Sequence, residues 1–344
     1  MTGRIAVLTG GGDCPGLNAA IRAVVRVSHE RGSQAIGIRD GWRGLVEGKV
    51  EPLGLREISG ILPRGGTILG TTGVDPRRLD GGVERVLEHA RGLDAIVAIG
   101  GEGTLGVAAD LHALHGLPVV GVPKTIDNDL AGTDYTIGFD TAVSIATEAI
   151  DRLHTTAESH NRVMVVEVMG RESGWIAIHA GLAAGADVIL VPEHPMTVEG
   201  VTSLLGARHR RGKDFSIVVV AEGCPLVFES GERRIVAQGV DQNGFVRYGG
   251  IGYELGGELE RRTGFQTRVT VLGHVQRGGT PTGRDRVLAA RLGLLAADLA
   301  HDRRFGLMAA VRGDEVVPVS LRDATAERKG VPARLYAEAR AFFG

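Results

Sequence analysis

Short apolar runs alternate with stretches of helical periodicity along most of the chain. The runs are bounded by glycine or polar residues and are almost entirely apolar, which is typical of strands buried on both faces of a parallel sheet. We predict strands at Ile5–Thr9, Ala35–Ile38, Ala95–Ile99, Val119–Val122, Val163–Val168, Val188–Val191, Ile217–Ala221 and Val269–Leu272. Apolar residues at helical spacing predict helices at Leu17–Glu30, Val83–His89, Thr104–His115, Ala142–Leu153, Val201–Arg211 and Val287–Leu299. This alternation predicts an α/β protein with two doubly wound, Rossmann-like α/β/α domains and mostly parallel sheets.

Glycine is unusually frequent, at 53 of 344 residues, about twice its usual share of ~7%. The glycines gather directly after predicted strands, as in Gly10–Gly12 and Gly100–Gly103. Ligands of open α/β sheets bind at the carboxyl ends of the strands, so this placement favours binding loops over flexible linkers. The most irregular stretch, Pro225–Gly252, is predicted to be a surface insertion with a hairpin.

Composition narrows the class of protein and its partners. The 39 basic and 41 acidic residues give a net charge of −2, which indicates no nucleic-acid partner and no anionic membrane surface. Cys14 and Cys224 form neither a disulfide framework nor a zinc motif, so a reducing compartment is expected. No signal-peptide pattern and no apolar run of about 18 residues is present, so we expect a cytoplasmic protein.

Two glycine loops are candidate phosphate sites. The segment Thr9–Gly16 precedes a predicted helix, whose N-terminus favours anions; the alternative is an ordinary tight turn. The segment Ile99–Leu105 (IGGEGTL) resembles the GGDG-like loop of several kinase families, including NAD kinases and diacylglycerol kinases. There a phosphate chain passes the glycines and the acid holds Mg²⁺. Glu102 could instead be a solvated loop carboxylate.

The segment Pro123–Asp129 (PKTIDND) carries two carboxylates and a lysine at a strand end. One carboxylate can accept the proton of an attacking hydroxyl, the other can position a metal, and the lysine can neutralise phosphate charge. The alternative is an Asx-rich turn.

Arginines mark a third group of candidates. Met169–Arg171 follows one strand and His274–Gly279 follows another, and arginine suits bidentate recognition of phosphate. A lone His274 would more often be structural, but the neighbouring Arg277 and glycine pair favour an anion site.

Taken together, GGGDCPGLNAAIR, GGTILGTT, IGGEGT, PKTIDNDLAGTDYTIGFDTA, VEVMGRESG, AEGC and LGHVQRGGTP resemble the 6-phosphofructokinase family, in the family's order, over residues 4–300. The resemblance implies the phosphofructokinase fold, with a phosphoryl-donor domain at 1–138 plus 252–305 and a sugar-phosphate domain at 139–251 plus 306–344. It implies Mg²⁺-dependent transfer of a phosphoryl group to the 1-hydroxyl of fructose 6-phosphate, giving fructose 1,6-bisphosphate. It also implies a homotetramer with active sites at subunit interfaces.

Matching the family motifs assigns roles to residues. Asp127 would be the base, Thr125 would hydrogen-bond the reacting groups, and Glu102 and Asp129 would serve Mg²⁺. The donor-binding residues would be Gly12, Gly101, Glu102, Gly103 and Thr104. The sugar-phosphate residues would be Arg162, Met169, Gly170, Arg171, Glu222, Arg268, His274 and Arg277, with Arg162 and Arg268 reaching in from a neighbouring subunit.

Four positions bear on the choice of donor. Glu102 stands where the family usually has aspartate, one methylene shorter. Pyrophosphate-dependent relatives have a second carboxylate at the position of Gly103, where glycine leaves room for a nucleoside triphosphate, so we expect ATP. Lys124 replaces a common glycine and is typical of pyrophosphate-dependent relatives and of some ATP enzymes close to them. We hypothesise that Lys124 supplies the positive charge of an arginine that many ATP-dependent members have at the position of Gly73.

A regulatory site is a further expectation. The residues that match the bacterial effector site for a nucleoside diphosphate or phosphoenolpyruvate are Arg22, Arg26, Asp187, Arg211 and Lys213. His154 stands where an arginine is common. The alternative is a solvated basic helix face.

Three other functions stay open from the sequence. The nearest is a pyrophosphate-dependent, reversible phosphofructokinase. An NAD or lipid kinase would account for the GGEGT loop alone. A non-catalytic subunit that binds sugar phosphate would leave the retained Thr125, Asp127 and Asp129 unexplained.

Overall fold

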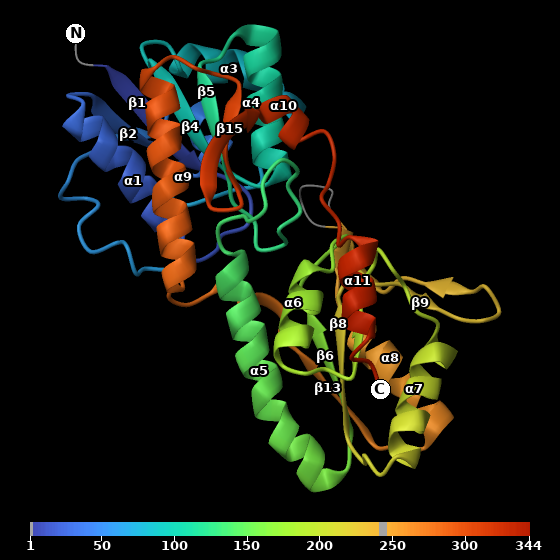
Figure 1. Ribbon diagram of the computed structural model, residues 1–344. Helices are drawn as coiled ribbons and strands as arrows, with labels where there is room; N and C mark the ends of the chain where they lie inside the picture. The colour runs from blue at the N-terminus through green and yellow to red at the C-terminus, as the bar shows by residue number, and fades with distance from the viewer. Residues whose placement is uncertain (1–2, 241–245) are drawn as a thin grey trace. The chain divides into compact units, whose positions relative to one another are not determined.

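A computed structural model describes residues 3–240 and 246–344, which form two compact units (Figure 1). The first unit comprises the chain up to Thr141 together with Arg277–Arg328. The second comprises Ala142–Gln276 together with Lys329–Gly344. Each unit has its own sheet and its own apolar core.

The first unit is built on a seven-stranded sheet in the order β15-β14-β5-β4-β1-β2-β3. The strands are β1 (Arg4–Thr9), β2 (Gln34–Ile38), β3 (Val50–Leu53), β4 (Ala95–Gly100), β5 (Val119–Pro123), β14 (Leu307–Arg312) and β15 (Glu315–Ser320). The five inner strands are parallel and the edge strands β3 and β15 are antiparallel. Every residue of β4 and β5 is buried, as their uniformly apolar sequences predict.

Helices cover both faces of this sheet. They are α1 (Leu17–Glu30), α2 (Gly41–Val46), α3 (Gly82–His89), α4 (Glu102–His115), α9 (Gly283–His301) and α10 (Leu321–Ala324), with a short 3-10 helix η1 (Pro76–Arg78). The long helices α1 and α9 pack against each other on one face (Figure 1). On the other face, Trp42, Val86 and Leu105 of α2, α3 and α4 join one apolar cluster with Leu321 of α10.

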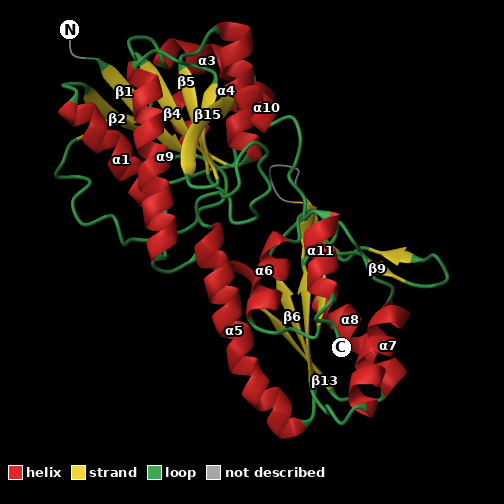
Figure 2. Cartoon of the chain, in the orientation of Figure 1, coloured by secondary structure: helices red, strands yellow, loops and turns green. Residues whose placement is uncertain are grey.

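The second unit has a four-stranded, fully parallel sheet in the order β13-β6-β8-β7. Figure 2 labels β6 and β13 of this sheet. The strands are β6 (Val163–Val168), β7 (Val188–Leu190), β8 (Ser216–Ala221) and β13 (Thr267–Val271). The helices are α5 (Phe139–His160), α6 (Trp175–Ala183), α7 (Val198–Arg210), α8 (Ile251–Thr263) and α11 (Ala333–Arg340). Most of α5 belongs to this unit. The 3-10 helix η2 (Gly273–Arg277) follows β13. Its core contains Val165, Val218, Leu205 and Leu255.

The irregular stretch Pro225–Gly252 contains two small antiparallel pairs, and residues 241–245 of it lie outside the described residues. One pair is β9 (Leu226–Val227) with β10 (Arg233–Arg234). The other is β11 (Ala237–Val240) with β12 (Val246–Tyr248).

The predicted strands and helices are all present, as is the expected α/β fold with mostly parallel sheets. The predicted domain boundaries need two corrections. Residues 252–276 lie in the second unit, because β13 pairs with β6 at its sheet edge. Residues 306–328 lie in the first, because β14 pairs with β5. Within the described residues, no helix is both long enough and apolar enough to cross a membrane.

Candidate active site

The loop after β1 is hydrogen-bonded to two other segments of the first unit. The amide of Gly10 donates to the carbonyl of Ile99 at 3.0 Å, and the amide of Gly11 donates to the carbonyl of Thr72 at 2.9 Å. A Cβ at Gly12 would overlap the guanidinium of Arg277. Glycine at position 12 therefore lets Arg277 approach the loop backbone closely.

Arg277 belongs to the first unit, where it lies against Gly12; its expected place among the sugar-phosphate residues stays a prediction. Among the described residues, its buried Nε has no hydrogen-bond partner. Buried donors are normally satisfied, so this nitrogen is suited to a ligand oxygen.

The loop after β4 leads directly into α4, whose first residue is Glu102 and whose N-cap is Gly101. A Cβ at Gly100 would overlap Thr104, so packing requires glycine there. At Gly103, in contrast, a Cβ would meet nothing within 4 Å. Packing therefore explains one glycine of this loop and leaves the other unexplained.

Glu102 has a partner that sequence reasoning missed. Its Oε2 lies 2.7 Å from Nε of Arg328, which is 226 residues further along the chain. The backbone of Arg328 forms an isolated antiparallel bridge with Leu130, which is the residue after Asp129. No local motif surrounds Arg328, so only the fold reveals this contact.

Lys124 anchors the loop after β5 to the loop after β1. Its side chain is 3% exposed, and its Nζ donates to the carbonyls of Gly10, at 2.9 Å, and of Gly12. Burial lowers the pKa of Lys124, and the nearby charge of Arg277 lowers it further. Two cations, Lys124 and Arg277, thus lie at the same glycine loop.

The turn Thr125–Asp129 is shaped by Asn128, a residue that sequence reasoning did not single out. Asn128 has a φ of 50°, in the left-handed region that asparagine tolerates better than most residues. Its Oδ1 accepts from the amide of Thr136 at 3.0 Å, and its Nδ2 donates to the carbonyl of Asp134 at 3.1 Å. Asn128 therefore orients the two aspartates that flank it.

The two aspartates repel each other. Burial and the adjacent charge of Asp127 raise the pKa of Asp129 to about 6. The amide of Asp127 donates to Oγ1 of Thr125 at 3.1 Å. A cation placed between carboxylates of this kind would relieve the repulsion.

The three loops follow β1, β4 and β5, which are neighbouring parallel strands. The loops therefore meet at the carboxyl ends of these inner strands. No group of three or more His, Cys, Asp or Glu residues able to hold a metal occurs in the described part of the chain. Mg²⁺ does not require one, because it binds through one or two carboxylates together with substrate phosphates. Glu102 and Asp129 fit that donor set.

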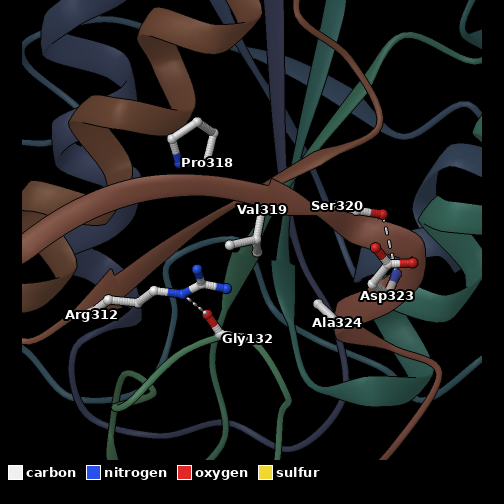
Figure 3. Close-up of a pocket in the computed structure, with 7 residues that line it drawn as sticks. All are labelled: Gly132, Arg312, Pro318, Val319, Ser320, Asp323 and Ala324. Atoms are coloured by element: carbon white, nitrogen blue, oxygen red, sulfur yellow. Dashed lines mark hydrogen bonds between the residues drawn. The ribbon is translucent and has the colours of Figure 1, made fainter.

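A pocket elsewhere in the first unit contains none of the predicted site residues (Figure 3). It is lined by residues that include Arg312, Val319 and Asp323. Nε of Arg312 donates to the carbonyl of Gly132 at 3.4 Å. We assign it no role.

In the second unit, two loops interlock at the carboxyl ends of β6 and β8. Gly170 has a φ of 137°, and its carbonyl accepts from the amide of Gly223 at 3.2 Å. A Cβ at Gly223 would overlap the carbonyl of Arg171. Met169, Gly170, Arg171 and Glu222 are thereby held on adjoining loops.

The buried Gln276 supports this arrangement, because its Oε1 accepts from the amide of Met169 at 3.3 Å. His274 is exposed on η2, which follows β13.

Arg162 and Arg268 lie at the other end of this sheet. Arg162 comes immediately before the first residue of β6, and Met169 comes immediately after the last one. Because a strand rises about 3.3 Å per residue, the two residues lie roughly 20 Å apart. Arg268 pairs with Met164 near the same amino end. Within one chain, neither arginine joins the loop of Met169.

The predicted effector residues are divided between the units. Arg22 and Arg26 lie on α1, and Asp187, Arg211 and Lys213 lie in the second unit. Oδ1 of the buried Asp187 pairs with Nη1 of Arg208 at 2.9 Å, and its Oδ2 accepts from the amide of Ile217 at 2.8 Å. Sequence reasoning missed Arg208, whose partner is distant in sequence.

Comparison with known proteins gives consistent matches. The family model described as Phosphofructokinase matches residues 4–300. The pyrophosphate–fructose 6-phosphate 1-phosphotransferase of Amycolatopsis mediterranei is 56% identical and covers 99% of this chain and 100% of its own. The ATP-dependent 6-phosphofructokinase 3 of Streptomyces coelicolor is 55% identical, over 98% of each chain.

Solved structures give the same picture of the fold. A phosphofructokinase of Saccharomyces cerevisiae superposes with a TM-score of 0.79 at 31% identity, over 99% of this chain. This chain spans about half of the yeast chain, 47% of its length. A pyrophosphate-dependent phosphofructokinase of Nitrosospira multiformis, 20% identical, shares the fold with a TM-score of 0.83 over 99% of this chain and 92% of its own. The chain belongs to the phosphofructokinase family.

Proposed function

We propose that this protein is an ATP-dependent 6-phosphofructokinase, which phosphorylates the 1-hydroxyl of fructose 6-phosphate and requires Mg²⁺. The observation that carries the proposal is that three loops meet at the carboxyl ends of β1, β4 and β5. There Lys124 is hydrogen-bonded to the glycine loop, and Asp127 and Asp129 follow Lys124 in the same turn. Family membership supplies the reaction type. The NAD-kinase and lipid-kinase alternatives lose their basis, because the match extends far beyond the GGEGT loop.

Each residue has a defined task in this proposal. Asp127 accepts the proton of the 1-hydroxyl as that oxygen attacks the donor's terminal phosphorus, and Thr125 fixes the turn that orients it. Lys124 and Arg277 place positive charge where the phosphates must lie. Glu102 and Asp129 would hold Mg²⁺, which would supply neutralising charge for the donor phosphates.

Gly103 supports ATP as the donor. It lies in the first turn of α4, where acidic residues are favoured and where glycine costs about 1 kcal/mol relative to alanine. It has no positive φ, and a Cβ would meet open space. Since the fold does not require glycine there, a donor that needs the space explains it.

Replacing Gly103 with aspartate should lower the ratio of ATP-dependent to pyrophosphate-dependent turnover by about tenfold or more, ~1.4 kcal/mol. The added carboxylate would repel and crowd the α-phosphate of ATP, which pyrophosphate lacks. A coupled assay with fructose 6-phosphate and each donor measures the ratio. Gly106→Asp is the matched control, because it adds the same charge to open space on the same helix. An unchanged ratio contradicts the role of Gly103.

The same assay on the unaltered protein tests the proposal itself. Turnover with ATP and none with pyrophosphate supports it. Turnover with pyrophosphate alone would establish the second candidate, a reversible pyrophosphate-dependent enzyme. That candidate is favoured by Lys124 and by the name of the Amycolatopsis mediterranei relative. Binding of fructose 6-phosphate without turnover would revive the non-catalytic subunit.

The proposal extends to assembly and regulation. A homotetramer with sites at its interfaces would use Arg162 and Arg268 on a neighbour, which agrees with their distance from Met169 in one chain. An effector site would include Asp187, although its carboxylate already pairs with Arg208. The proposed location is the cytoplasm.

Metal binding should weaken as the pH falls through 6. The pKa of Asp129 is raised to about 6 in the folded protein, so its protonated form favours folding at low pH, and this contribution is lost as the pH rises through 6. Cation binding has the opposite dependence, because it requires the ionised carboxylate. We expect Mn²⁺ to bind roughly tenfold more weakly at pH 5 than at pH 7. Equal binding at the two pH values would contradict this assignment, and Asp129→Asn should abolish the difference.

A further inference from the structure

Arg328 interacts with both segments to which the proposed function assigns the metal. Its Nε contacts Oε2 of Glu102 at 2.7 Å. Its backbone bridges to Leu130, the residue after Asp129, and its charge acts on the Asp129 carboxylate. The guanidinium is therefore placed by the fold, through main-chain pairing, and not only by its own flexible side chain.

This ion pair has little value for stability. The side chains of Arg328 and Glu102 are 39% and 45% exposed, and exposed pairs of this kind contribute little to folding. A positive group on a carboxylate that must receive a divalent cation also opposes the cation directly. The pair is therefore better explained by the site than by the fold.

The identity of residue 102 is part of the same arrangement. Glu102 carries its carboxylate on two methylenes, one more than aspartate would have. Glu102 is the first residue of α4, so the helix fixes its backbone and the length of the side chain sets how far the carboxylate reaches. Glutamate and Arg328 thus form a matched pair in this chain.

We propose that Arg328 is a positioning residue that competes with the donor's divalent cation for Glu102 and so sets the metal affinity of the site. This inference rests on the proposed function, which assigns Glu102 and Asp129 to the metal. The guanidinium occupies Oε2 of Glu102, and its charge repels a cation placed on either oxygen of that carboxylate. Metal affinity is accordingly lower than the carboxylates alone would give.

Mn²⁺ binding to the full chain tests the competition directly. The water-proton relaxation rate reports bound Mn²⁺, first with Mn²⁺ alone and then with the β,γ-imido analogue of ATP or with imidodiphosphate. Arg328→Gln should bind Mn²⁺ about two- to fivefold more tightly than the unaltered protein. It should lower the KM for Mg²⁺ and leave kcat within about threefold. Arg328→Lys, which keeps the charge, should stay closer to the unaltered protein.

Two controls make the result specific. Arg334→Gln removes the same charge from another exposed pair, in which Nε of Arg334 lies 3.0 Å from Oε1 of Glu338, and should not change Mn²⁺ binding. In a Glu102→Asp background, the shorter side chain no longer matches Arg328. There, Arg328→Gln should change Mn²⁺ binding by less than about twofold.

The outcomes separate this inference from the proposed function. If Glu102→Gln leaves Mn²⁺ binding unchanged, the metal assignment is wrong and the inference falls with it. If Glu102→Gln weakens binding but Arg328→Gln has no effect, only the role of Arg328 is overturned. Weaker Mn²⁺ binding in Arg328→Gln also overturns it, since the guanidinium would then support the bound donor. A thermal unfolding curve for each variant confirms that it is folded.

Discussion

Replacing Asp127 with asparagine should lower kcat by about 10³-fold, within the range of 10²–10⁴ that a general base contributes. Asparagine has nearly the same shape and keeps the amide contact of residue 127 with Thr125. It cannot accept the proton of the sugar hydroxyl. The substitution also removes a charge that raises the pKa of Asp129, so the metal carboxylate should become easier to ionise.

The loss should appear in kcat and not in the KM for fructose 6-phosphate, because the proton moves only as the hydroxyl attacks. Steady-state rates over a range of sugar phosphate measure both quantities. Asp134→Asn is a matched control, since Asp134 lies on the segment after the turn and accepts from the amide of Gly313 at 2.7 Å. A fall in kcat of less than tenfold in Asp127→Asn would rule out Asp127 as the base.

Replacing Lys124 with methionine should lower kcat/KM for the donor by about 100-fold, ~2.7 kcal/mol. Methionine fills a similar volume but leaves the carbonyls of Gly10 and Gly12 without the ammonium that they accept from. An unsatisfied buried polar group costs about 1–3 kcal/mol. The glycine loop after β1 also loses Lys124 as a cation and keeps Arg277.

Lys124→Gly tests the hypothesis that Lys124 supplies the positive charge that Gly73 cannot. The variant has the glycine that the resemblance leads us to expect at position 124. If Lys124 replaces the arginine that is missing at Gly73, this variant should lose at least tenfold in turnover. A smaller loss would show that the lysine organises the loop without acting on the phosphates. Lys49→Met is the matched control, since Lys49 is exposed and pairs with Glu47 at 2.6 Å.

Local patterns were enough to find the loops and many of the elements, although not the buried strand β14 or the helices α2, α6, α8 and α11. Strands such as β4 are apolar throughout because both of their faces are covered, and that property is visible in a run of six residues. The glycine loops and PKTIDND are also local, so their residues could be recognised without the fold. The antiparallel edge strand β15 was missed, because its partly exposed residues show no such run.

Residues far apart in sequence could not be brought together in this way. The family motif assigns Arg277 to the sugar-phosphate residues, and only the fold shows that it lies against Gly12. Arg328 has no motif and reaches Glu102 through the bridge with Leu130. Even the glycines differ: Gly100 is required by Thr104, whereas Gly103 faces open space.

The sequence by itself determined the α/β fold class, the family resemblance and the three loops that carry the chemistry, because each is encoded in contiguous residues. Only the tertiary structure decided where the units divide, which cation lies at which loop, and what holds Glu102. These depend on strand order, as when β13 joins β6 and β14 joins β5, and strand order is set by pairing between distant segments. No local pattern of residues contains that information.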